Sequence, residues 1–429
     1  MTPGANAVES PAVKPFQRAV VDDLERALSR DRRLFQVVVG PRQAGKTTAV
    51  QQLMDRLNRS CHLAAADTAL PPGPEWIESH WTAALALPAA AGTPAILVLD
   101  EIQKVRGWSE VVKRLWDDSV RSRRPLHVIL LGSSSLLLQR GLVESLAGRF
   151  LLHRCPHWSW AECREAFAWD LDRWLFFGGY PGAAPFADDE PLWKRYVADG
   201  LVEPAIARDV LQLQTVHKPS LLRHLFAFAA AFPAQHVSYN KMLGQLQDVG
   251  NTTTLAHYLK LLETAFLVSG LELYSAGRGR RRGSSPKLIV WNSALVHALS
   301  PLSFADARGD GAWWGRVVEN AVGAHLLNHL HEPIWQVTYW RDGDQEVDFV
   351  VTRGREVWAL EVKSGRPCRL SGLEAFRIRY PRSHAVLVGG HGIPLGDFFA
   401  RSPADFFEAW GEAARTPARK TDRARKRVT

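Results

Sequence analysis

The sequence has 429 residues, 46% of them hydrophobic and 23% charged; these are the proportions of a globular protein and exclude a disordered or collagen-like chain. Its length exceeds one ordinary core and predicts about two to four domains. The formal net charge is +9, but residues 415–429 hold seven basic residues and one acid, which leaves only about +3 for the rest. We expect this basic tail to be disordered, and either to bind a polyanion or only to solvate the terminus.

Targeting and cysteine signals favour a cytoplasmic protein. The four cysteines include no C-x-x-C pair, which is typical of a reducing compartment. The N-terminus lacks the pattern of a signal peptide. An uncharged stretch over residues 81–99 is interrupted by Pro88, Gly92 and Pro94, so we expect no membrane segment and no membrane partner. A cluster of His153, Cys155, His157 and Cys163 lacks standard zinc spacing, so no zinc site is expected there.

A phosphate-binding loop follows the first predicted helix, an amphipathic segment over residues 16–30. An apolar run over residues 34–39 predicts a buried strand, residues 40–47 read GPRQAGKT, and residues 48–57 predict a helix. This order of strand, loop and helix lets backbone N–H groups at a helix N-terminus face a phosphate. The predicted ATP-binding residues are Gly40, Pro41, Arg42, Gln43, Ala44, Gly45, Lys46, Thr47 and Thr48.

Individual roles follow from the chemistry of this loop. Lys46 is predicted to reach the β- and γ-phosphates, and the Thr47 hydroxyl to bind Mg²⁺. A second apolar strand, predicted over residues 95–99, ends in Asp100 and Glu101. Two acids at the end of a buried strand are costly unless they are compensated, and metal and water would compensate them. We therefore predict that Asp100 binds Mg²⁺ and that Glu101 orients the attacking water.

Two further catalytic candidates follow along the chain. A helix around Trp108 to Trp116 and a strand over residues 128–131 lead to three serines at 133–135. Ser133 or Ser134, with Ser134 preferred, is predicted to help position the water; the alternative is a serine-rich turn without a catalytic part. Arg149 is a candidate arginine finger, which would stabilise charge on the γ-phosphate of a neighbouring subunit. The alternative is an ordinary surface arginine.

These motifs carry a resemblance that covers roughly residues 16–391. The segments GPRQAGKT, LVLDE, LLGSSS, LAGRF and FGGYPGA (177–183), with EPAIARD (203–209), resemble prokaryotic AAA-type ATPases that pair a P-loop domain with a C-terminal domain of formerly unknown function. The serine run departs from the threonine or asparagine often found at that place. The resemblance implies ATP and Mg²⁺ as cofactors, and a homo-oligomeric ring.

A helical region occupies residues 221–274. Asn251 precedes three threonines and predicts a capped helix through Leu262, and a hairpin-like stretch follows it. This order predicts a winged-helix-like module, with the arginine-rich segment 278–283 as a basic wing that contacts phosphate. The alternative is a packing module with a solvated basic loop.

A last group of charged residues predicts a nuclease-like site. Glu319 lies on a predicted helix, Asp348 on a strand, and Glu361 and Lys363 on the next strand. A two-residue turn at Gly354 and Arg355 would place Asp348 opposite Glu361, with Lys363 on the same face. This is the D…E-x-K arrangement of restriction-endonuclease-like folds, in which Glu319, Asp348 and Glu361 would bind Mg²⁺ and Lys363 would activate water. The alternatives are a salt bridge only, or a relic site that binds nucleic acid without cutting it.

Together these predictions give an α/β protein. It has a P-loop AAA-type core over residues 1–155, a helical lid or linker over 156–215, and a winged-helix-like module over 216–290. A small α/β PD-(D/E)xK nuclease-like domain over 291–400 precedes a C-terminal helix and basic tail over 401–429. The predicted function is Mg²⁺-dependent ATP hydrolysis acting on nucleic acid, with DNA expected. The alternative is a nucleotide-controlled switch that binds a protein partner through an inactive nuclease-like domain.

Overall fold

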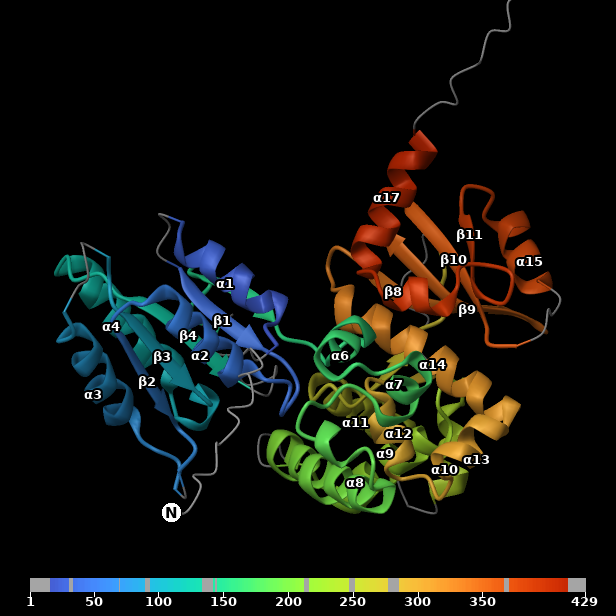
Figure 1. Ribbon diagram of the computed structural model, residues 1–429, viewed down its shortest axis with the longest axis horizontal. Coiled ribbons are helices and arrows are strands. Elements are labelled where there is room, and N and C mark those ends of the chain that lie inside the picture. Colours follow the sequence, from blue (N-terminus) through green and yellow to red (C-terminus); the bar gives the residue numbers. More distant parts are fainter. Residues whose placement is uncertain are drawn as a thin grey trace, which may run out of the picture. The chain divides into compact units, whose positions relative to one another are not determined.

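The computed structural model describes residues 16–30, 34–68, 70–88, 93–132, 142, 145–211, 216–246, 251–276, 285–365 and 370–415 (Figure 1). The chain divides into two compact units. The first comprises Met1–Trp158 and Glu162–Asp170, and the second Ser159–Ala161 and Leu171–Thr429. Within the described residues, no helix is long and apolar enough to cross a membrane.

The first unit is built on a parallel sheet of five strands. The strands are β1 (Phe35–Val39), β2 (Cys61–Ala65), β3 (Ile96–Asp100), β4 (His127–Gly132) and β5 (Phe150–Arg154). Their order is β2-β3-β4-β1-β5, and every neighbouring pair is parallel. The strands β1, β3 and β4 are almost entirely apolar and buried, because helices cover both faces of the sheet.

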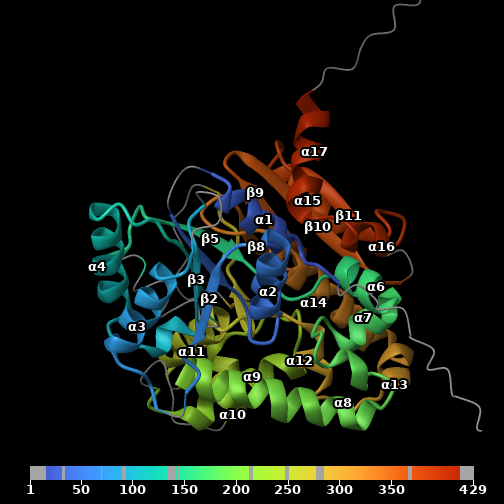
Figure 2. The ribbon, with the colours of Figure 1, turned by 60° about the vertical axis from the view of Figure 1, so that its left-hand side comes forward.

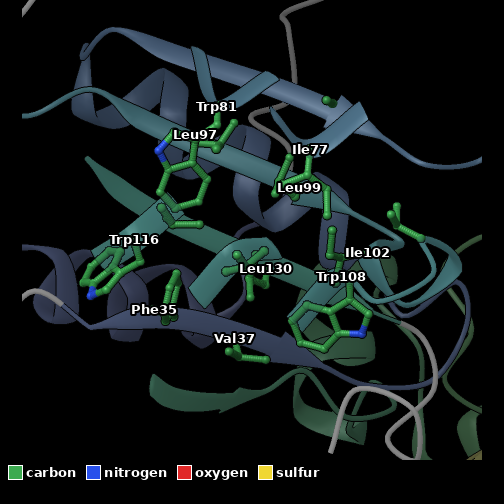
Figure 3. Packing of buried hydrophobic residues seen from close by; sticks show 14 of the residues in the cluster. Phe35, Val37, Ile77, Trp81, Leu97, Leu99, Ile102, Trp108, Trp116 and Leu130 are labelled. Carbon is green, nitrogen blue, oxygen red and sulfur yellow. The ribbon is translucent and has the colours of Figure 1, made fainter. Parts of the chain in front are cut away.

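Alternating side chains of these strands enter two hydrophobic cores. On one face, Val38 packs with residues of α1 (Ala19–Leu28) and α2 (Lys46–Leu57). On the other face, Val37 packs with residues of α3 (Pro74–Leu85) and α4 (Trp108–Arg121), as Figure 3 shows. The helix predicted over residues 16–30 begins only at Ala19, because Arg18 before it has an extended backbone conformation; Phe16 packs against the ring of Trp158 at a centroid distance of 5.1 Å. The unit is therefore a three-layer α/β/α sandwich.

The second unit begins with a helical part. Its elements are α7 (Leu171–Phe177), η2 (Ala184–Phe186), α8 (Glu190–Val197), the π-helical turns η3 (Ala198–Val202) and η4 (Ala205–Leu211), α9 (Pro219–Ala231), α10 (Tyr239–Leu246), α11 (Thr252–Thr264), α12 (Ser293–His297), α13 (Phe304–Gly309) and α14 (Gly311–His329). Asn251 caps α11, its side-chain oxygen accepting a hydrogen bond from the Thr254 N–H at 2.7 Å. After α11, β6 (Val268–Leu271) and β7 (Lys287–Val290) form an antiparallel pair. The predicted basic wing, 278–283, lies outside the described residues.

A second sheet follows this helical part, and it lies apart from α8, α9 and α10 in both views (Figures 1 and 2). Its strands are β8 (Gln336–Asp342), β9 (Gln345–Arg353), β10 (Glu356–Lys363) and β11 (His384–Gly389), in the order β11-β10-β9-β8. The β9–β10 hairpin turns at Gly354, whose φ of 58° suits glycine, and its register is the predicted one, from Glu356 opposite Arg353 to Leu360 opposite Phe349. The remaining helices are α6 (Trp160–Phe167), α15 (Ser371–Arg379), α16 (Leu395–Phe399) and α17 (Pro403–Arg415).

Candidate functional site

The phosphate-binding loop joins the end of β1 to the start of α2. Gly45 has a φ of 90°, a left-handed conformation that glycine adopts without strain. Gly40 is needed for space, because a Cβ atom there would lie 1.9 Å from the carbonyl oxygen of Cys155. Of the predicted ATP-binding residues, Gln43, Thr47 and Thr48 are exposed, whereas Pro41, Ala44 and Lys46 are buried. Arg42 is half-buried. One side of the loop is thus packed against the rest of the unit, whereas Gln43, Thr47 and Thr48 are exposed.

Lys46 and Thr47 begin α2 with their side chains engaged. The Lys46 Nζ donates hydrogen bonds to the carbonyl oxygens of Gly40 at 3.0 Å and Pro41 at 2.8 Å. The Thr47 hydroxyl donates to Asp100 Oδ2 at 2.7 Å, although the two residues are 53 positions apart. The structure therefore brings the hydroxyl predicted to bind Mg²⁺ and the carboxylate predicted to bind it into direct contact.

Glu101 follows Asp100 in an unusual backbone conformation. Its φ of 53° is uncommon for a residue with a side chain, and such strained conformations cluster at functional sites. The backbone N–H of Glu101 donates to Asp100 Oδ1 at 2.8 Å, and its own carboxylate accepts from Gln103 Nε2 at 2.8 Å. Both acids at the end of β3 are thereby fixed in position.

The donor set of this site fits a magnesium ion. Mg²⁺ prefers oxygen ligands and is usually bound by one or two protein groups together with substrate phosphates and water. The hydroxyl of Thr47 and the carboxylate of Asp100 are such groups, and they lie next to the phosphate-binding loop. A P-loop of this kind implies nucleotide binding, for which the backbone N–H groups at the start of α2 are suited.

A buried arginine that the sequence analysis missed holds the loop from behind. Arg18 Nη1 donates to the carbonyl oxygen of Ala44 at 3.0 Å and to that of Pro156 at 2.9 Å. The indole N–H of Trp158 donates to the same Ala44 oxygen at 3.0 Å. Arg18 is paired with Glu162, with Nε 2.8 Å from Oε1. Because Arg18 and Trp158 both donate to this loop carbonyl, we infer that Arg18 is a positioning residue for the loop.

Replacing Arg18 by methionine is expected to weaken both folding and ATP binding. The Ala44 carbonyl loses a charged donor and Glu162 loses its partner, which should lower the free energy of unfolding by about 1.5–3 kcal/mol. ATP affinity should fall by roughly tenfold, equivalent to about 1.4 kcal/mol. Thermal unfolding and titration with a fluorescent ATP analogue measure the two effects.

Two further variants separate positioning from stability. Arg18→Met combined with Glu162→Gln removes the unpaired carboxylate, so it should recover stability but not ATP affinity. Arg26→Met, on the exposed face of the same helix, is the matched control and should change neither. ATP affinity that stays unchanged in Arg18→Met would contradict the positioning role.

The two other predicted catalytic residues of the first unit are Ser134 and Arg149, and of these the structure describes Arg149. Ser134 lies outside the described residues, as do Ser133 and Ser135. Arg149 directly precedes β5, and its carbonyl oxygen accepts a hydrogen bond from the Phe35 N–H at the start of β1. The phosphate-binding loop follows the other end of β1, so Arg149 and the loop lie at opposite edges of the sheet. The Arg149 side chain is half-exposed beside Asp117, with N–O distances of 3.4 and 3.5 Å.

The predicted nuclease-like residues gather in the second unit around a lysine that the prediction did not include. Lys287, the first residue of β7, has a fully buried side chain. Its Nζ lies 2.5 Å from Glu319 Oε1 and 3.4 Å from Asp348 Oδ1. Glu346 Oε1 also lies 3.4 Å from this Nζ. The cluster of these three acids and Lys287 is called the acid cluster below.

Glu361 and Lys363 lie beside the acid cluster. The Lys363 Nζ donates to Glu361 Oε1 at 2.6 Å, and the other Glu361 oxygen is buried without a hydrogen-bond partner. Burial, together with the charge of Asp348, raises the pKa of Glu361 to about 7. Burial and Asp348 likewise raise the pKa of Glu319 to about 8. Burial would lower the pKa of Lys287, but Glu319, Asp348 and Glu346 raise it above its usual value. The Lys287 ammonium therefore stays charged, while the raised pKa values of Glu319 and Glu361 favour the neutral form of these two carboxyls.

The acid cluster does not fit a divalent metal ion. Asp348 Oδ2 accepts from the Val362 N–H at 2.8 Å, and Asp348 Oδ1 and Glu319 Oε1 face the Lys287 ammonium. Among the described residues, no group of three or more His, Cys, Asp or Glu side chains is arranged to bind a metal ion. The structure thus brings Glu319 and Asp348 together, but around an ammonium.

Comparison with known families defines the class of the first unit. Residues 32–164 match the family model described as an AAA domain, which agrees with the P-loop and the parallel sheet of the first unit. Residues 168–306 and 314–401 match two families described as domains of unknown function, DUF8612 and DUF4143.

Relatives with similarity across both units are themselves uncharacterized. A protein of Mycobacterium tuberculosis is 27% identical over 393 residues, covering 89% of this chain and 82% of the relative. One of Haemophilus influenzae is 25% identical over 355 residues, covering 78% and 83%. Among solved structures, Aeropyrum pernix ORC1 in complex with DNA is 15% identical with a TM-score of 0.30, over 70% of this chain and 95% of that one. The Thermotoga maritima RuvB Holliday junction branch migration motor is 15% identical with a TM-score of 0.31, over 58% and 87%.

Arg18 and Lys287 were not among the predicted site residues, and they differ in whether the sequence indicated that they are buried. No sequence pattern indicated that Arg18 is buried, because an arginine ahead of a helix is ordinarily exposed. The sequence did indicate that Lys287 is buried, because it directly precedes the apolar run 288–290 of a buried strand. A charge at the start of such a strand needs a partner, and that need predicts an acid near it.

Proposed function

We propose that this protein hydrolyses ATP with Mg²⁺ at the phosphate-binding loop. The observation that carries the proposal is the 2.7 Å hydrogen bond from Thr47 to Asp100, which joins the two motifs such a reaction needs. Bound Mg²⁺ would neutralise charge on the β- and γ-phosphates. Lys46, now bonded to loop carbonyls, would turn to the phosphates, and Glu101 would orient the water. Arg149, remote from its own loop, would act on a neighbouring copy of the chain, and Ser134 would help to position the water.

We further propose that the second unit acts on nucleic acid, with DNA the expected partner. Three features support this proposal. The helices α9, α10 and α11 lead into the β6–β7 pair in the order of a winged-helix-like module. The β9–β10 hairpin has the register expected for a nuclease-like D…E-x-K arrangement. The sequence also carries basic segments at 278–283 and 415–429, which suit phosphate contacts that fix orientation without reading sequence.

The second candidate is a nucleotide-controlled switch whose nuclease-like domain is inactive. The observation that favours inactivity is the buried ammonium of Lys287 among Glu319, Glu346 and Asp348. It argues against cutting but does not argue against binding. We therefore favour a nuclease-like domain that binds nucleic acid without cleaving it. This keeps the nucleic-acid partner of the first candidate and agrees with the buried ammonium of Lys287.

One experiment tests these proposals together: ATP turnover and plasmid integrity are followed in the same tube, with and without Mg²⁺. Turnover should require Mg²⁺, rise when DNA is added, and leave the plasmid intact. Asp100→Asn should abolish turnover, whereas Asp55→Asn, in the same unit but hydrogen-bonded to the exposed Gln51, should retain it. Absence of turnover would reject the ATPase proposal, and a nicked or linear plasmid would reject binding without cutting. Turnover that DNA leaves unchanged would favour the switch.

A further inference from the structure

The Lys287 side chain is held in place from several directions. Its backbone pairs with Leu271 and bridges to His236, which fixes the start of β7. Its Nζ lies 5.0 Å from the centre of the Phe349 ring, close enough for a favourable cation–π contact. It also donates a hydrogen bond to the Asp348 carbonyl oxygen at 3.2 Å. The position of the ammonium is therefore built into the fold and does not result from a flexible side chain settling on an acid.

Three acids surround this ammonium. Glu319 comes from α14, whereas Glu346 and Asp348 come from β9, so two separate elements converge on one cation. The second oxygen of Glu346 lies 3.5 Å from His236 Nδ1. With the ammonium in this place, a divalent ion bound to the same oxygens would meet a like charge at short range, which is strongly unfavourable in a buried setting.

We propose that Lys287 is the resident cation of the acid cluster and takes the place of the divalent metal that its acids would otherwise bind. The second unit then keeps a nuclease-like arrangement of acids without the means of metal-dependent cleavage. The proposal concerns a site separate from the phosphate-binding loop, so it stands whether or not the first unit hydrolyses ATP. It assigns a role to a residue that belongs to neither the P-loop nor the D…E-x-K pattern.

A titration with Mn²⁺ on the full-length protein tests the proposal directly. Mn²⁺ is added without nucleotide, and the free ion is followed by its electron paramagnetic resonance signal in wild type, Asp100→Asn, Asp348→Asn and Glu361→Gln. We expect that any saturable binding is lost in Asp100→Asn and unchanged in the other two variants; absence of binding in wild type would agree equally. Binding that survives Asp100→Asn and disappears in both Asp348→Asn and Glu361→Gln would overturn the proposal.

Removing the ammonium gives a second and independent test. Lys287→Met keeps the apolar stem but leaves three acids without a cation, so the melting temperature Tm should fall on the order of 10 °C. Adding Glu319→Gln to that variant should recover part of the loss, because it removes one uncompensated charge. The control Lys260→Met removes an exposed lysine of α11 and should leave Tm unchanged.

A smaller side chain should convert the acid cluster into a metal site. In Lys287→Ala the acids are free of the ammonium and space is left between them, so millimolar Mn²⁺ should raise the Tm of this variant by roughly 3 °C or more. Any Mn²⁺ bound at Asp100 stabilises both variants alike, so the same Mn²⁺ should raise the Tm of Lys287→Ala by more than it raises that of Lys260→Met. A Tm of Lys287→Met equal to that of wild type would show that Lys287 is not needed to balance the acids, and would count against the proposal. The Mn²⁺ titration of wild type remains decisive if either Lys287 variant does not fold.

Discussion

Replacing Lys46 by alanine is expected to reduce ATP turnover by about 10²–10³-fold, the usual cost of removing one group that stabilises transition-state charge. In the structure the Lys46 ammonium is buried and bonded to the carbonyl oxygens of Gly40 and Pro41, so it is already within the loop that would hold the phosphates. A coupled assay of phosphate release at saturating ATP and Mg²⁺ measures the effect.

The controls for Lys46→Ala address folding and general charge. Lys46 also ties the loop to itself, so thermal unfolding must show that the variant is folded before its turnover is compared. Arg26→Ala removes a positive charge from an exposed position of α1 and should keep wild-type turnover. A Lys46→Ala protein that is folded and turns over within a few-fold of wild type would contradict the role assigned to the loop.

Glu101→Gln is expected to separate ATP binding from ATP hydrolysis. The substitution keeps the size of the side chain and an oxygen for the Gln103 amide, but removes the charge that polarises water. Turnover should fall by about 10²–10⁴-fold, the range of a positioned general base, while ATP affinity should stay close to that of wild type. Filter retention of radiolabelled ATP, read together with phosphate release, detects a protein that holds ATP without consuming it.

A neighbouring acid provides the comparison for Glu101→Gln. Glu78 lies on α3 and is paired with Arg114, both of them exposed, so Glu78→Gln should leave both binding and turnover unchanged. If Glu101→Gln lost ATP affinity as strongly as turnover, the acid would be needed to assemble the site and could not be assigned only to the attacking water.

The strand and the helix on either side of the phosphate-binding loop were predictable because their signals are local. The apolar run 34–39, the glycines of the loop and the acids after β3 each carry their meaning within a few residues. The β9–β10 register was predictable for the same reason, since a two-residue turn at Gly354 determines which residues pair. The first and last residues of the helices were less well predicted. The helix expected from Thr48 begins at Lys46, because the left-handed Gly45 already places the next residue in the helix.

The contacts of Arg18 and Lys287 could not be predicted from the sequence alone. Arg18 donates to Ala44, 26 positions away, and to Glu162, 144 positions away. Lys287 meets Asp348 across 61 positions. No periodicity or spacing rule connects residues so far apart, and both side chains are buried charges whose partners are set by tertiary packing. The predicted metal site of the second unit was affected most, because the buried Lys287 alters what Glu319, Glu346 and Asp348 can bind.

Arg18 also determines where the nucleotide-binding domain can be separated from the rest of the chain. The match to the AAA family begins at residue 32, yet α1 and Arg18 precede it. A protein fragment cut at that match would lose Val21 and Leu24, which are fully buried against the sheet, and would expose the apolar face they cover. Such a face favours aggregation. We therefore expect a stable fragment of the first unit to start no later than Arg18, and a family boundary drawn from sequence similarity is not a boundary of folding.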